Sequence, residues 1–165
     1  MSRTRMFHFS GLVCLFLVPL FLTPILKAAT GSGDSREISQ LISRAQRGIS
    51  EVRRDTSEME QFGRSRIGWE AHTLKLTEIK EVVNQMAGTL QRLNVIRDTG
   101  SSSQQQAIGR LQLTLKEFAA NIESTIQHLN MNHQDISTCV AMDPEYRKLL
   151  RSNSESAARL AEFAE

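Results

Sequence analysis

WEAHTLKLTEIKEVVNQMAGTLQRLNVIRD, residues 69–98, is the most regular stretch of this 165-residue chain. Side chains that suit a core recur along it in steps of three and four, at Trp69, His72, Leu76, Ile79, Val83, Met86, Leu90 and Leu93. On an α-helix this spacing lays the side chains along one face. The stretch therefore predicts a long helix with one buried seam, which ends at Thr99 and Gly100 with the glycine in the left-handed conformation.

A second seam precedes this stretch and predicts a helix that begins at Asp34. Asp34 is expected to cap the helix, with Glu37 reaching back to it. The seam then comprises Ile38, Ile42, Ala45, Ile49, Val52, Thr56 and Met59, and the charged residues beside it, Asp55 included, are expected to face water. Gly63 and Gly68 predict a turn. The alternative is one helix from 35 to 98, because two glycines at about 1 kcal/mol each weaken a helix without forbidding it.

The C-terminal part of the chain predicts two further helices. SSSQQQ at 101–106 offers Ser103 and Gln106 as a capping box. The seam that follows comprises Ile108, Leu111, Leu115, Phe118, Ile122, Ile126, Leu129, His133 and Ile136, and the helix is expected to end near Thr138. Asp143 and Pro144 open the last helix, because proline at the first helical position gives up no hydrogen bond. Its inner face is expected to comprise Tyr146, Leu149, Leu150, Ala157, Leu160 and Phe163.

Together these seams predict an all-α fold. Only 5% of the residues are aromatic and there are only 3 prolines, which is typical of long helices rather than sheets. Three long helices and a shorter C-terminal one with short connections favour an antiparallel four-helix bundle, a single domain over residues 34–165. A coiled-coil-like dimer of two long hairpins would bury the same seams.

The first 31 residues have the order of a secretory signal peptide. Arg3 and Arg5 precede the apolar stretch GLVCLFLVPLFLTPIL at 11–26, and small residues follow up to Gly31. The stretch is shorter than the ~20 residues that span a bilayer. We therefore expect residues 1–31 to be a cleaved signal peptide, with an uncleaved N-terminal anchor as the alternative. Either outcome predicts a periplasmic or extracellular protein that touches a membrane only through an uncleaved leader.

The charge of the exported part disfavours nucleic-acid binding. Removing Arg3, Arg5 and Lys27 takes 20 basic side chains to 17, against 18 acidic ones. Phosphate binding needs a clustered basic excess instead. The arginines at 44, 47, 53 and 54 are expected on a solvated face, paired with nearby acids. Their alternative role is docking to an anionic polymer or to lipid headgroups.

The histidines are the one grouping that suggests a ligand. Folding the chain back near Gly100 places His72 level with His128 and Trp69 level with Met131, and it brings His133 to the same end. Imidazole and thioether groups suit copper, zinc or haem iron. However, His128 and His133 are five residues apart, which separates them by about 140° on a helix and prevents both from facing one metal. Structural histidines are the simpler interpretation.

Two functions follow from these features. The sequence holds none of the signatures GxSxG, HExxH and CxxC, so no catalytic residues and no cofactor are expected. The leading hypothesis is a non-enzymatic exported protein that binds another envelope protein, or itself, with Trp69 as a candidate anchor. The alternative is an exported metal or haem carrier that uses His72, His128, His133 and Met131. Cys139 is the only cysteine outside the leader, and we expect it to be buried or to form an intermolecular bridge.

Overall fold

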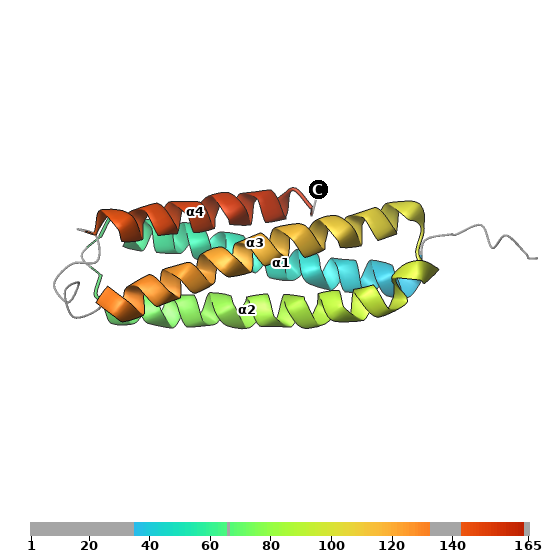
Figure 1. Cartoon of the computed structure of the whole chain (residues 1–165), viewed down its shortest axis with the longest axis horizontal. Helices are drawn as coiled ribbons and strands as arrows, with labels where there is room; N and C mark the ends of the chain where they lie inside the picture. Colours follow the sequence, from blue (N-terminus) through green and yellow to red (C-terminus); the bar gives the residue numbers. More distant parts are fainter. Residues whose placement is uncertain (1–34, 66, 133–142, 164–165) are drawn as a thin grey trace, which may run out of the picture.

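The computed structural model describes residues 35–65, 67–132 and 143–163, and these form a bundle of α-helices (Figure 1). The helices are α1 (Arg36–Phe62), α2 (Trp69–Ile96), α3 (Ser102–Asn132) and α4 (Pro144–Ala161), with a single 3-10 turn, η1 (Arg97–Thr99), after α2. Each helix packs against the next in the chain, and α4 closes the bundle against α1. The predicted all-α antiparallel bundle is therefore confirmed. None of these described helices is both long enough and apolar enough to cross a membrane.

The chain reverses direction between α1 and α2, so the predicted turn is correct and the single long helix is excluded. Helix α1 stops at Phe62, and the N–H of Gly63 donates to the carbonyl of Met59. Gly63 lies so close to α4 that a Cβ on it would come 2.8 Å from Cδ1 of Leu150. Glycine at this position therefore allows the end of α1 and the start of α4 to pack closely.

The helix caps differ in detail from the predicted ones. Ser35 rather than Asp34 caps α1, its hydroxyl accepting the N–H of Ile38. The capping box of α3 is formed by Ser101 and Gln104 rather than by Ser103 and Gln106. Asp143 caps α4 as expected and accepts the N–H groups at positions 145 and 146.

Gly100 is extended, with φ −89° and ψ 164°, so the predicted left-handed cap is wrong. Helix α2 instead tightens into η1, and the N–H of Gly100 donates to the carbonyl of Arg97. What requires glycine here is space, since an added Cβ would lie 2.6 Å from Cδ1 of Ile38. The small residue lets the start of α1 pack against the α2–α3 connection.

The core follows the predicted seams with a few additions. Leu41 and Val82 are buried although neither was placed on a seam, while Ile42, Leu90 and Ile126 are only partly buried. Asp55 is 2% exposed, which contradicts its predicted position in water. It pairs with Arg54 at 3.1 Å. The largest fully buried side chains are Tyr146, Phe118, Ile38, Ile49, Met59, Leu76, Ile79, Leu93, Ile108, Leu111, Leu129 and Leu150.

Helix α4 is 18 residues long, whereas α1, α2 and α3 have 27, 28 and 31 residues, so it covers only part of the bundle (Figure 1). Beyond its end the N-terminal part of α3 approaches α1 directly. Gln104 of α3 accepts the N–H of Ser35 at 3.0 Å and donates to its carbonyl and to the hydroxyl of Ser39. The bundle thus has four helices at one end and three at the other, where a buried glutamine joins α1 to α3.

Candidate functional site

Two parts of the bundle hold groups that could act on a ligand: the end where the histidines gather and a groove between α1 and α2. At the first, His72 of α2 is fully buried, and its Nδ1 lies 3.0 Å from the hydroxyl of Tyr146. The rings of Phe62 and Tyr146 contact His72 edge-on, with centroids 5.7 and 5.3 Å away. Burial disfavours the charged imidazolium and lowers the pKa of His72 to about 4. This side chain is therefore neutral at pH 7.

His128 of α3 reaches the same tyrosine but has a different hydrogen-bond partner. Its Nε2 lies 2.7 Å from Oδ2 of Asp143, while its ring stacks on Tyr146 with a centroid distance of 6.1 Å. Burial opposes the charge of Asp143, but hydrogen bonds from His128 and from the N–H groups of Tyr146 and Glu145 hold its pKa below the usual value. His128 thus connects α3 to the cap of α4.

The structure therefore brings His72 and His128 to one end of the bundle, as predicted, with Tyr146 in contact with both. Met131 does not turn inward at this end, since it is 68% exposed. Within residues 35–65, 67–132 and 143–163, no cluster of three or more His, Cys, Asp or Glu could hold a metal ion. His133 and Cys139 lie outside the described residues, and so does the predicted end of α3 near Thr138. The metal or haem hypothesis stays a prediction.

One polar atom at this end has no partner. Nε2 of His72 is buried and forms no hydrogen bond with any described residue. Burying such an atom costs free energy that an apolar side chain of similar size would not cost. Trp69, one turn before His72, is half-buried and packs against the core. Its predicted role as a partner anchor stays a prediction.

Beside this end, Lys75 of α2 joins the acids of α1 and α2. Its Nζ lies 2.8 Å from Glu78, 3.1 Å from Glu58 and 3.9 Å from the buried Asp55. The hydrogen bond with Glu78, aided by Glu58 and Asp55, raises the pKa of Lys75 against the effect of burial. Asp55 therefore lies between Arg54 and Lys75, and these two cations compensate its buried charge.

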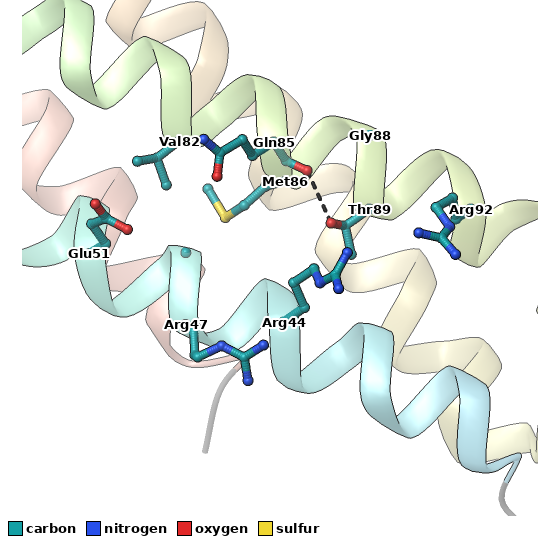
Figure 2. Close-up of a pocket in the computed structure, with 10 residues that line it drawn as sticks. Arg44, Arg47, Glu51, Val82, Gln85, Met86, Gly88, Thr89 and Arg92 are labelled. Atoms are coloured by element: carbon teal, nitrogen blue, oxygen red, sulfur yellow. Dashed lines mark hydrogen bonds between the residues drawn. The ribbon is translucent and has the colours of Figure 1, made fainter.

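The second part is a groove on the outer surface between α1 and α2, which we call the arginine groove (Figure 2). Its main hollow has a volume of about 670 Å³ and is lined by Arg44, Arg47, Gly48, Glu51, Val82, Gln85, Met86, Gly88, Thr89 and Arg92. A second hollow of about 470 Å³ continues toward the start of α1 and shares Arg44 and Arg92 with the first. Arg36, Glu37, Gln40 and Leu41 complete its lining.

The floor of the arginine groove is apolar, while its edges carry Arg44, Arg47 and Arg92 together with Glu51 (Figure 2). Met86 reaches from α2 toward α1 (Figure 2). Gly48 of α1 leaves room for this side chain. A Cβ on Gly48 would come 2.7 Å from Cγ of Met86. Arg44 and Arg47 extend from α1, and Arg92 extends from α2 (Figure 2). The groove therefore presents guanidinium groups around a methionine.

Some bases of the described chain pair with a carboxylate, whereas the arginines of the groove do not. Arg54, Arg64, Lys75, Lys80, Lys148 and Arg159 each lie within 4.0 Å of a carboxylate oxygen. Among residues 35–65, 67–132 and 143–163, Arg44, Arg47 and Arg92 form no such pair. The prediction that the arginines at 44, 47, 53 and 54 are paired with nearby acids thus holds for Arg54 and is wrong for Arg44, Arg47 and Arg53.

Comparison with protein-family models, with curated proteins and with solved structures gives no match for this chain. The geometry of the groove is therefore what indicates its function. The groove was not predicted from the sequence, because the seams do not show that Arg92 lies beside Arg44. The signal was present nonetheless: a reversal at Gly63–Gly68 places the second half of α2 beside the first half of α1.

Proposed function

We propose that this chain is a non-catalytic exported protein of the cell envelope that acts by binding another protein, or a second copy of itself, through the arginine groove. The observation that carries the proposal is that Arg44, Arg47 and Arg92 line one hollow, whose floor is formed by apolar side chains. Protein-binding surfaces are enriched in arginine and methionine, and their centres are apolar. The groove has this composition.

Export is proposed from the leader at residues 1–31, whose basic start, apolar stretch and small residues are those of a secretory signal. A non-catalytic role is supported by the histidine end, where His72 and His128 bond to Tyr146 and Asp143. These bonds serve packing and capping. Among the described residues, neither imidazole lines the arginine groove.

The experiment is site-specific photo-crosslinking in the host cell. A photo-crosslinking amino acid replaces Gln85, which lines the groove, and in the matched control it replaces Gln127, an exposed glutamine of α3. We expect a discrete adduct at position 85 and none at 127, with the crosslinked polypeptide identified by mass spectrometry. Sedimentation of the purified protein distinguishes a partner from a second copy. Equal adducts at both positions, or none at either together with a monomer in sedimentation, would refute the proposal.

A further inference from the structure

The arginine groove also indicates what kind of partner it accepts, an inference that rests on the proposed function. Its two hollows are continuous, because Arg44 and Arg92 line both. With Arg36 and Arg47 the linings include four guanidinium groups, against the two carboxylates of Glu37 and Glu51. The groove is thus a local cationic surface on a mature chain whose net charge is slightly negative. Its charge is complementary to carboxylates.

The floor of the groove restricts the partner further. Leu41, Val82 and Met86 contribute buried apolar side chains to the linings. A ligand that carries only charge would pair with the arginines and leave these side chains unused. An amphipathic segment would use both, since its apolar side chains can contact the floor while its carboxylates meet the arginines on the two helices.

Gly88 gives an independent indication that a chain approaches closely here. It lies within the 28-residue helix α2, where glycine costs about 0.5–1 kcal/mol relative to alanine. A Cβ on it would meet no described atom within 4 Å, so the packing of the bundle does not require glycine. Gly88 lines the groove beside Thr89 and Arg92. The close approach of another backbone explains a glycine at this position.

Other occupants fit less well. A second copy related by a two-fold axis through the groove would place Arg44 and Arg92 against the same cations of its partner. A flat bilayer surface would reach the arginines at the edges, but not the floor that Val82 and Met86 form between the two helices. A helix of a different protein meets neither difficulty, because a groove between two helices is a common receptor for a third.

We infer that the arginine groove binds an acidic amphipathic helix of a partner protein, whose carboxylates pair with Arg44, Arg47 and Arg92 and whose apolar side chains contact Met86. The helix lies along the groove and passes closest to α2 at Gly88. The interaction is one of charge and packing and involves no covalent step.

The test measures binding of a labelled synthetic peptide to the full chain as its host exports it. The probe is an 18-residue amphipathic helix with one leucine and alanine face and glutamates along both edges, and its control carries lysine at every glutamate. The variant R44Q/R92Q removes two groove arginines. The matched control R53Q/R110Q removes two exposed arginines that do not line the groove. Fluorescence anisotropy at several salt concentrations gives each affinity.

We expect the glutamate peptide to bind in a salt-dependent way and the lysine peptide not to bind. R44Q/R92Q should weaken binding about tenfold or more, because two charge-assisted pairs are lost, while R53Q/R110Q stays within about twofold. Gly88→Gln should weaken binding several-fold while the thermal midpoint stays the same or rises, so misfolding cannot explain the loss. Equal weakening by both double variants, or full binding by Gly88→Gln, would overturn the inference.

Vesicles containing phosphatidylglycerol test the alternative that the groove binds lipid headgroups. If they bind with the same dependence on Arg44 and Arg92 while the glutamate peptide does not bind, the groove recognises headgroups and the inference is wrong. The photo-crosslinking experiment at Gln85 distinguishes a failure of this inference from a failure of the proposed function. A partner crosslinked at Gln85 whose capture is unchanged in R44Q/R92Q would sustain protein binding and refute an acidic helix.

Discussion

Acid should weaken this bundle through one buried side chain, His72. The pKa of His72 falls from 6.5 in the unfolded chain to about 4 in the bundle, because burial excludes the charged form. The unfolded chain therefore binds this proton more readily, and the contribution of His72 to stability is retained above pH 6.5 and lost as the pH falls toward 4. The linkage relation gives a loss of about 2 kcal/mol between pH 7 and pH 5, and of about 3 kcal/mol by pH 4.

The assay is urea unfolding followed by circular dichroism at pH 7, 6, 5 and 4.5. The control is the double variant H72L/Y146F, which removes both partners of the hydrogen bond, so that neither group is left unpaired in the core. We expect the wild-type free energy of unfolding to fall across this range, and the fall to be about 2 kcal/mol smaller in the double variant. The pKa of Asp143 is below 3.8, so its contribution to stability is lost only at a more acidic pH than that of His72. Parallel curves for the two proteins would refute the reasoning that burial keeps His72 neutral.

Three further predictions concern packing and are read from urea unfolding at pH 7. Gln104→Ala should lower the free energy of unfolding by about 1–3 kcal/mol, because its amide satisfies backbone groups at the start of both α1 and α3, while the exposed Gln106→Ala should change it by less than about 0.5 kcal/mol. Gly100→Ala should cost about 1–3 kcal/mol, since its Cβ would come 2.6 Å from Cδ1 of Ile38, and an unchanged stability would show that this contact is not tight. Gly88→Ala should raise stability by about 0.5–1 kcal/mol, because its Cβ meets open space, and a loss would reveal a neighbour there.

The bundle could be predicted because its seams are long and regular. Steps of three and four residues identified four helices, and Asp143 with Pro144 marked the start of α4 correctly. The start of α3 was placed two residues late because SSSQQQ offers the spacing of a capping box more than once, and local sequence does not choose among the copies. Gln104 forms the capping box because it also makes hydrogen bonds with the first backbone groups of α1. A contact between residues so far apart in the sequence cannot be inferred from a local sequence pattern.

The candidate site was less predictable, because it depends on which residues of α1 and α2 lie level. The apolar seams indicate that charged residues lie on the surface, but they do not indicate which charged residues of different helices contact each other. Asp55 was misplaced for this reason, since Lys75 approaches it from α2 and compensates its buried charge. Arg92 and Arg44 line one hollow only once the two helices are aligned. The histidine end could be predicted because a reversal near Gly100 places His72 level with His128, yet the part of Tyr146 in joining them was not foreseen.

The unequal lengths of the helices give the two halves of the molecule different resistance to local opening. Amide protons of α1 near Met59 are protected by neighbours that include α4, whereas those near Leu41 depend on a three-helix end. Hydrogen exchange should therefore begin at that end, which fewer buried contacts hold closed. The second hollow, with Arg36 and Leu41, lies along it. A ligand bound there would slow exchange in the softer half and leave the half beneath α4 nearly unchanged.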